Sequence, residues 1–337
     1  MAKVDELNQL YNSKDPNDII KFYDHFNTPE ELIEWSRNRP HGRAKIYTVK
    51  GDTDIVVVIP TADRHGEYAK NCEKEIFKGQ QIVFVESGSR GDPYFNYARN
   101  TNIGLRYALR YKPKWVILSN DDVYKIDNFS ILKESLTKIN NELYDTIYIK
   151  PDPGFYHSDL VGVLKMPKLF KILKTFLSKN AQDRLTERLR LKLIKKFNIT
   201  YQVRSKEKPY KNKLFSFLNR LEYKPIEEWR NLGDFAIFSP VVLKNAKGKP
   251  FDEIFINGGE DYDLGKSLFD SHKHISINFR IGSVGGGTFR RQPQKPGAKT
   301  LIKSPKVDNQ KSNARKLQDV FNILYFDYKY KQTQKDN

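Results

Sequence analysis

Three apolar, strand-like runs alternate with two helix-like stretches between residues 53 and 127. The runs are TDIVVVIPT (residues 53–61), QQIVFVESGS (80–89) and KWVILSNDDVYKID (114–127), and the helical stretches cover residues 67–77 and 93–111. Continuous β-branched runs are typical of strands buried on both faces of a parallel sheet. This order predicts an α/β fold with a doubly wound sheet flanked by helices.

Polar side chains stand where the apolar part of each run ends. They are Thr61, Asp63 and Arg64 at the end of the first, Glu86, Ser87 and Ser89 at the end of the second, and Asn120, Asp121 and Asp122 within the third. Ligands of doubly wound sheets bind at the carboxyl ends of the strands. Ordinary loop polarity explains any one cluster, but three clusters at one edge predict a binding site.

The stretch FINGGEDYDL, residues 255–264, joins a strand-like run to an apparent helix. Gly258 and Gly259 allow a tight turn and a close approach of the backbone to a ligand. Glu260 and Asp261 then stand at the start of the helix, where a carboxylate is a candidate general base. The alternative is that these acids complement the helix dipole and that the glycines form a simple loop.

The charge balance indicates an anionic partner. The 59 basic and 41 acidic residues give a net charge of +18, which fits a nucleic acid, a phosphorylated small molecule or a membrane surface. A hydrophobic share of 38% excludes a disordered chain. The single cysteine, Cys72, excludes an internal disulfide framework and a cysteine-based zinc site. No apolar run is long enough to span a bilayer, and MAKVDELNQL lacks the apolar stretch of a signal peptide, so we expect a cytoplasmic location.

Much of the positive charge lies between Lys165 and Lys224. This segment holds 18 Lys or Arg residues and four acids, so 18 − 4 = +14. One helical face there is apolar, with Met166, Leu169, Phe170, Leu173, Phe176 and Leu177, and DRLTERLRLKLIKKF (residues 183–197) repeats the pattern. Such helices either lie on an anionic membrane, which would make the location peripheral to its inner face, or pack their apolar faces on the rest of the protein.

Five motifs in order give the chain a resemblance to the family 2 glycosyltransferases and their relatives with the GT-A fold. The motifs are IVVVIPTADR, VESGSRGD, NYARNTNIGLRYAL, ILSNDDV and FDEIFINGGEDYDL, and NLGDFAIFSPVVL resembles the strand before the last. The Gly-Gly-Glu-Asp form is also similar to galactosyl- and N-acetylgalactosaminyltransferases of this fold. The resemblance implies an inverting transferase that uses a nucleotide-sugar donor of the UDP type.

The resemblance also implies roles at the donor. The nucleoside would be lined by Pro60, Thr61, Arg64, Glu86 and Ser87, with Glu86 accepting from a uracil-like base. The nucleotide would be held from the helix by Arg99 and Asn100. Asp122, with Asn120 or Asp121, would coordinate the Mn²⁺ or Mg²⁺ that bridges the donor diphosphate.

At the acceptor, the resemblance implies that Asp261 is the general base and that Gly258, Gly259 and Glu260 contact the acceptor. The acceptor class would be a glycan, a lipid-linked glycan or a protein. Two positions depart from the family pattern. The DxD-like motif begins with Asn120, and the region where the family often has a metal-binding histidine reads NFRIGSVGGGTFRRQ, with His272 and His274 too early.

The glycine-rich run in that region is a second candidate for the diphosphate. Gly285, Gly286 and Arg290 could close over it through backbone amides and a guanidinium. The alternative is a flexible linker into QPQKPGAKTLIKSPK.

We expect four segments: N-terminal helices over residues 1–50, a GT-A catalytic domain over 51–290, a basic insertion within it over 158–224, and a C-terminal linker and docked amphipathic helix over 291–337. In the first, Thr28 and Pro29 predict a helix start. Two other functions stay open. The first is a nucleic-acid-binding protein on a degenerate scaffold, which is disfavoured because carboxylates in a groove repel phosphates. The second is a sugar nucleotidyltransferase, which is disfavoured because that class has a glycine-rich signature after its first strand and this chain has none there.

Overall fold

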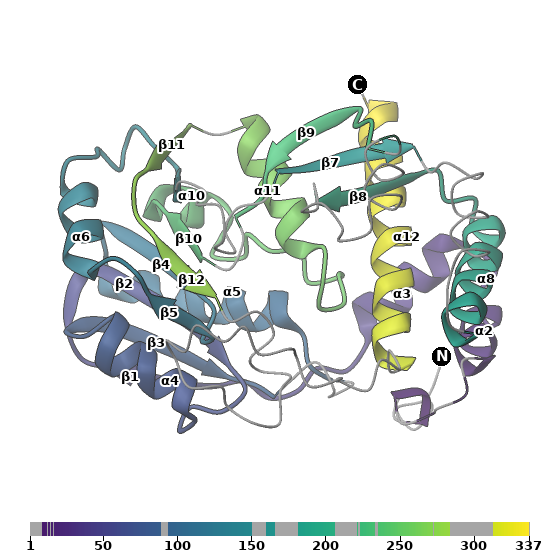
Figure 1. The fold of residues 1–337 in the computed structure, drawn as a ribbon, viewed down its shortest axis with the longest axis horizontal. Coiled ribbons are helices and arrows are strands. Elements are labelled where there is room, and N and C mark those ends of the chain that lie inside the picture. Colours follow the sequence, from purple (N-terminus) through teal and green to yellow (C-terminus); the bar gives the residue numbers. More distant parts are fainter. Residues whose placement is uncertain are drawn as a thin grey trace.

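The computed structural model describes residues 9–88, 94–149, 160–165, 181–205, 221–232, 235–283 and 313–336, apart from residues 12, 14, 16, 222 and 272. Its centre is a seven-stranded sheet (Figure 1). Across the sheet the strands are β1 (Lys45–Val49), β3 (Gln80–Glu86), β2 (Asp52–Thr61), β4 (Trp115–Ser119), β10 (Phe235–Phe238), β6 (Thr146–Ile149) and β11 (His274–Ile277). Five strands share one direction, while β1 and β10 run against them. The α/β class is confirmed, with a mixed sheet.

Helices cover both faces of this sheet because the side chains of β2 alternate between them. Ile55, Val57 and Ile59 face α4 (Glu67–Asn71), the π-helical turn Cys72–Ile76 and α6 (Phe129–Thr137). The opposite face packs against α5 (Tyr97–Ala108), α10 (Pro240–Asn245) and α11 (Glu260–Ser271). Gly104 of α5 lies so close to the sheet that a Cβ there would be 2.5 Å from Val58 Cγ1. The layers predicted around the sheet are therefore present.

Two local predictions are corrected. The run at residues 114–127 is two strands rather than one, because the chain leaves the sheet after Ser119 and resumes as β5 (Val123–Lys125), which pairs with β12 (Ile281–Ser283). Residues 45–49, expected among helices, form the edge strand β1, since KIYTV pairs with β3 along its length. The helices before it, α2 (Asn17–Asp24) and α3 (Pro29–Asn38), are as predicted, and Thr28 caps α3 by accepting from Glu31 N–H at 3.2 Å.

A second core lies beside the sheet (Figure 1). It is built by α2, α3, α8 (Ala181–Lys196), α12 (Asn313–Asp336) and a small antiparallel sheet of β8 (Tyr201–Ser205), β7 (Leu160–Lys165) and β9 (Glu227–Arg230). The C-terminal helix α12 buries Leu317, Phe321 and Leu324 in this core, so its predicted docking is confirmed.

The basic segment is described in part. In its second run, Leu193 and Phe197 are buried against the N- and C-terminal helices, so the apolar side of α8 packs within the protein there. The first run, residues 166–177, lies outside the described residues. Among the helices that are described, none has the length and apolar character that crossing a bilayer requires.

Candidate active site

The carboxyl edge of the main sheet gathers the predicted polar clusters. Thr61 ends β2 directly beside Glu86 at the end of β3, and Pro60, the residue before Thr61, is buried. Asn120 follows β4, the neighbour of β2 on its other side. β10 begins at this edge too, because Phe235 pairs with Ser119. The expectation that separate strands deliver these groups to one place is met.

The acidic turn after β4, residues 120–122, is hydrogen-bonded to the end of β2. Thr61 Oγ1 donates to Asp121 Oδ2 at 2.7 Å, and the exposed fractions of Thr61, Asp121 and Asp122 are 4%, 5% and 4%. Below them the Cys72 thiol donates to the Asp121 carbonyl at 3.3 Å. Burial, together with the charges of Asp121 and Asp122, raises the pKa of Cys72 well above its ordinary value. The thiol therefore stays protonated and supports the turn.

Glu86 is held by the backbone that follows β2. Arg64 N–H donates to Glu86 Oε2 at 2.9 Å. The Arg64 guanidinium lies 4.1 Å from the centre of the Phe84 ring and pairs with Glu73. Arg64 is thus at the predicted place, but its main chain rather than its guanidinium reaches Glu86.

Helix α5 carries Arg99 and Asn100, the two residues predicted to hold the nucleotide of the donor. Asn100 Nδ2 donates to Ser87 Oγ at 2.6 Å, and both side chains are buried. The Arg99 guanidinium instead donates to the carbonyl of Gly42 at 3.4 Å. Gly42 lies just before β1, whose first residue, Lys45, pairs with Glu86. The chain ahead of β1 therefore reaches this edge as well.

Two residues without a predicted role, Tyr97 and Asn257, join the acidic turn to the glycine loop, residues 257–259. The Tyr97 hydroxyl donates to Asn120 Oδ1 at 3.1 Å, and Tyr97 N–H donates to Asn257 Oδ1 at 2.9 Å. Asn257 Nδ2 in turn donates to the Phe95 carbonyl at 3.2 Å, and its φ of 49° is left-handed. Asparagine tolerates that conformation better than most residues, so an asparagine ahead of Gly-Gly was the available signal.

The glycine loop closes on itself before α11. Gly259 has a φ of 88°, which glycine adopts without strain, and Asp263 N–H donates to its carbonyl at 2.9 Å. Glu260 Oε2 accepts from Gly258 N–H at 2.6 Å, and Glu260 is 3% exposed. One oxygen of Glu260 therefore fixes the loop, and its contact with an acceptor stays a prediction.

Asp261, the predicted base, is half-buried at the start of α11. Its Oδ2 accepts from Asn231 Nδ2 at 3.1 Å, and Asn231 itself is 2% exposed. Asn231 stands between β9 and β10, so it approaches from the same sheet edge as the acidic turn. In the sequence Asn231 is the first residue of the motif NLGDFAIFSPVVL, where no local pattern predicts a role for it.

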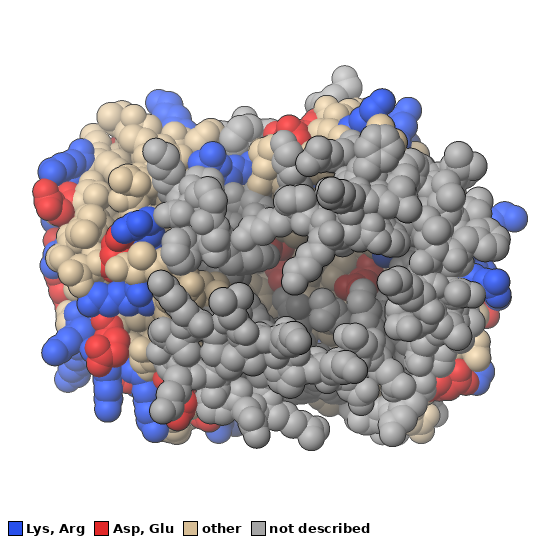
Figure 2. All heavy atoms as spheres, viewed as in Figure 1, with Lys and Arg blue, Asp and Glu red and all other residues tan. Residues whose placement is uncertain are grey.

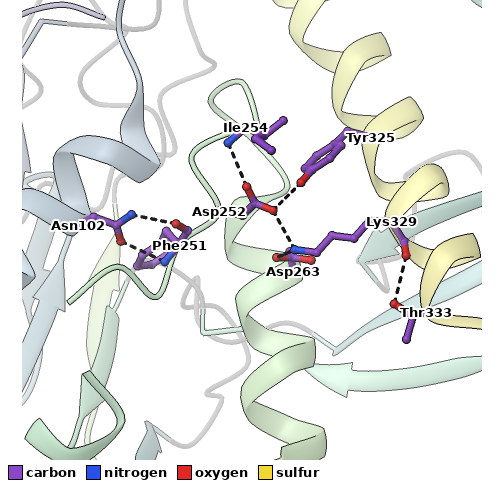
Figure 3. Close-up of polar contacts among 8 residues, drawn as sticks. All are labelled: Asn102, Phe251, Asp252, Ile254, Asp263, Tyr325, Lys329 and Thr333. Atoms are coloured by element: carbon purple, nitrogen blue, oxygen red, sulfur yellow. Dashed lines mark hydrogen bonds and ion pairs between the residues drawn. The ribbon is translucent and has the colours of Figure 1, made fainter. Parts of the chain in front are cut away.

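Asp263 faces the C-terminal helix instead (Figure 3). Lys329 of α12 pairs with Asp263 at 2.7 Å and with Asp252 at 2.9 Å, and the Tyr325 hydroxyl donates to Asp252 at 2.7 Å. Burial raises the pKa of Asp263, against the effect of Lys329. Burial alone would lower the pKa of Lys329, but the two carboxylates raise it. The contacts of Asp263 are therefore structural, because they fasten α11 to α12.

The buried Arg39 supports the loop from the N-terminal side. Its guanidinium donates to the Phe255 carbonyl at 3.0 Å and to Ser36 Oγ at 3.1 Å. Burial lowers the pKa of Arg39 to about 10, while the nearby charge of Glu260 acts in the opposite direction. The side chain therefore stays cationic at neutral pH behind the glycine loop.

Among the described residues, no group of three or more His, Cys, Asp or Glu side chains is arranged to hold a metal ion. His274 pairs with Thr146 at the sheet edge opposite Ser119, remote from the site, and His272 lies outside the described residues. Gly285, Gly286 and Arg290 lie outside them too. The chain that leads to them, β12, ends with Ser283 paired to Val123, the residue after Asp122.

Figure 2 shows acidic side chains near the centre of one face, with most visible Lys and Arg side chains around its edges. No protein-family model matches this chain, and no curated protein matches it significantly. The fold and the site define the class directly. The chain is an α/β protein with a buried acidic turn and a second carboxylate motif joined at one edge of a mixed sheet.

Proposed function

We propose that the protein is an inverting glycosyltransferase that moves a sugar from a nucleotide-sugar donor to an acceptor hydroxyl. The observation that carries the proposal is the link through Tyr97, which contacts Asn120 on one side and Asn257 on the other. A transferase needs a donor site and a base for the acceptor next to each other. The contacts of Tyr97 support that juxtaposition of the acidic turn and the glycine loop.

The acidic turn suits the diphosphate of the donor through a divalent cation. Asp121 and Asp122 are adjacent carboxylates with exposed fractions of 5% and 4%, and a bound cation would lower the cost of burying their negative charges. Mg²⁺ and Mn²⁺ prefer oxygen ligands, and one or two carboxylates suffice when phosphate oxygens and water complete the shell. Asp121 and Asp122 would hold the cation, which would stabilise the leaving diphosphate.

The nucleoside would extend from the turn over the ends of β2 and β3. Thr61 and Glu86 are direct neighbours there, and Asn100 fixes Ser87 beside them. Because adjacent strands are about 4.8 Å apart, the step from β4 through β2 to β3 spans about 10 Å. We therefore assign Glu86 to the base end of the donor and the acidic turn to its diphosphate end.

Asp261 would act as the general base. Its carboxylate takes the proton of the acceptor hydroxyl while the acceptor oxygen bonds to the anomeric carbon. The bond from that carbon to the diphosphate oxygen breaks, and its electron pair leaves with the nucleoside diphosphate. Attack opposite the leaving group inverts the anomeric carbon.

Titration calorimetry with UDP-glucose, UDP-galactose, UDP-N-acetylglucosamine and the matching GDP sugars, with and without Mn²⁺, tests the proposal. We expect one donor class to bind, more tightly with Mn²⁺, and Asp122→Asn to remove the effect of Mn²⁺. Asp54→Asn is the matched control, because Asp54 is exposed and lies near the start of β2. No binding by the wild-type protein to any of these donors would sink the proposal.

A further inference from the structure

Only one orientation of the Asn231 side-chain amide satisfies both of its hydrogen bonds. Asn231 Oδ1 accepts from Leu232 N–H at 2.9 Å, so the other end of the amide, the NH₂ group, faces Asp261. A rotated amide would place two oxygens together at Asp261 and leave the Leu232 N–H facing a donor. The backbone of Leu232 thereby fixes Asn231 as a donor to Asp261.

This bond distinguishes the two oxygens of Asp261. Oδ2 accepts from Asn231, so we assign Oδ1, for which no hydrogen bond from a described residue is present, to the substrate proton. Neighbouring acids are engaged in the fold, since Glu260 accepts from Gly258 and Asp263 pairs with Lys329. Asp261 is held by a neutral amide, which orients the carboxylate without adding a charge.

The hydrogen-bond donor to Asp261 comes from the segment between β9 and β10 rather than from the loop that precedes Asp261. Asn231 is 2% exposed and stands four residues before β10, whose first residue pairs with Ser119 next to the acidic turn. Asp261 belongs to α11, which comes after β10 in the sequence, whereas Asn231 comes before it. Asn231 thus ties the position of the base to the strand that borders the donor turn.

We infer that Asn231 is the positioning residue that holds Asp261 Oδ2 and directs Oδ1 to the acceptor hydroxyl. The inference rests on the proposed function. Misplacing a catalytic group by about 1 Å costs on the order of 100-fold in rate, so removing the amide in Asn231→Ala should lower kcat by about 10- to 100-fold with little change in donor affinity.

Asn231→Asp gives a sharper test because it keeps the acceptor for Leu232 N–H and replaces the NH₂ donor by an oxygen. Two carboxylates at this distance share a proton, which raises the apparent pKa of the pair. The acid limb of the pH profile of kcat/KM should therefore move up by about one pH unit or more. Asn141→Asp is the matched control, since Asn141 donates to the Lys114 carbonyl at 2.9 Å on an exposed part of the chain.

The reaction measured is hydrolysis of the donor that binds best in the calorimetric panel, with water as the acceptor. A double-mutant cycle accompanies it: Asn231→Ala added to Asp261→Asn should lower the rate by less than about twofold, because Asn231 acts through Asp261. A full additional loss in the double variant, or a rate reduced equally at every pH in Asn231→Asp, would make Asn231 merely structural and overturn the inference. A wild-type protein that binds donors but hydrolyses none would instead count against the proposed function.

Discussion

The hydroxyl of Tyr97 donates to Asn120 Oδ1 at 3.1 Å, across 23 residues of sequence. Tyr97 belongs to the first turn of α5 and Asn120 to the turn after β4, so the bond connects a helix to the end of its neighbouring strand. It also orients the first residue of the acidic turn. We expect this bond to affect the binding of the nucleotide-sugar donor more than the stability of the fold.

Tyr97→Phe should therefore weaken donor binding and leave stability almost unchanged. A neutral hydrogen bond contributes about 0.5 to 1.5 kcal/mol, which corresponds to about a 2- to 10-fold higher Kd for the donor. Calorimetry in the presence of Mn²⁺ measures the effect, and Tyr107→Phe on the same helix is the control. Equal donor affinities of Tyr97→Phe and wild-type protein would contradict this role.

Asn257 should be important for stability, since it combines a left-handed backbone with two hydrogen bonds to residues 95 and 97. Asn257→Ala loses both bonds and adds the cost of a left-handed alanine, for a total of about 2 to 4 kcal/mol in the free energy of unfolding. Asn257→Gly keeps the backbone conformation and should lose less. Urea unfolding of the two variants decides the matter, and an alanine variant as stable as the glycine variant would be the contrary result.

Lys329 should stabilise the docking of α12 on α11, the helix that follows the glycine loop. Lys329→Met leaves Asp252 and Asp263 without their shared cation, and breaking a buried pair costs about 3 to 5 kcal/mol. Because the Lys329 side chain is 39% exposed, solvent screening reduces our expectation to about 2 to 3 kcal/mol. Thermal unfolding compares it with Lys335→Met, an exposed lysine on the same helix. Similar Tm values for both variants would contradict the bridge.

His41 should make the protein less stable in acid. Burial, with the charges of Arg39 and Arg99, lowers its pKa from 6.5 to about 4, against a smaller effect of Glu253. Between these two values the unfolded chain binds more protons than the folded one, so the free energy of unfolding rises with pH and falls as the pH drops from 6.5 to 4.

His41 is half-buried, so screening leaves a contribution on the order of 1 kcal/mol. Urea unfolding at pH 7 and at pH 4.5 measures it. The loss between the two pH values should be smaller in His41→Gln than in the wild-type protein, while exposed His25→Gln should behave like the wild type. An unchanged loss in His41→Gln would refute the assignment.

Local patterns in the sequence predicted much of the main sheet and its helices. The apolar runs that became β2 and β3 and the Thr28 cap depend on neighbouring residues, which patterning records. The edge strand β1 was missed because five residues of mixed polarity carry little periodic signal, and its partner β3 lies more than 30 residues later. The reversed direction of β10 follows from pairing with β4 across more than 100 residues.

The candidate site divides in the same way. Glu86 and the acidic turn were predicted because Glu86 ends one recognisable strand and the turn directly follows another. Tyr97 with Asn257 and Asn231 with Asp261 were missed because these pairs are 160 and 30 residues apart, and the helix and loops that bring them together are not encoded in either local motif. Long-range side-chain contacts were therefore beyond the reach of the sequence alone.

The most direct test of the central claim compares wild-type protein and Asp261→Asn for release of nucleoside diphosphate from the donor that binds best, with Mn²⁺ present. We expect donor affinity to change by less than about threefold, since Asp261 would contact the acceptor rather than the donor, and the rate of release to fall by about 10² to 10⁴-fold, as loss of a general base requires. Equal rates of release from the two proteins, at equal donor binding, would contradict the account.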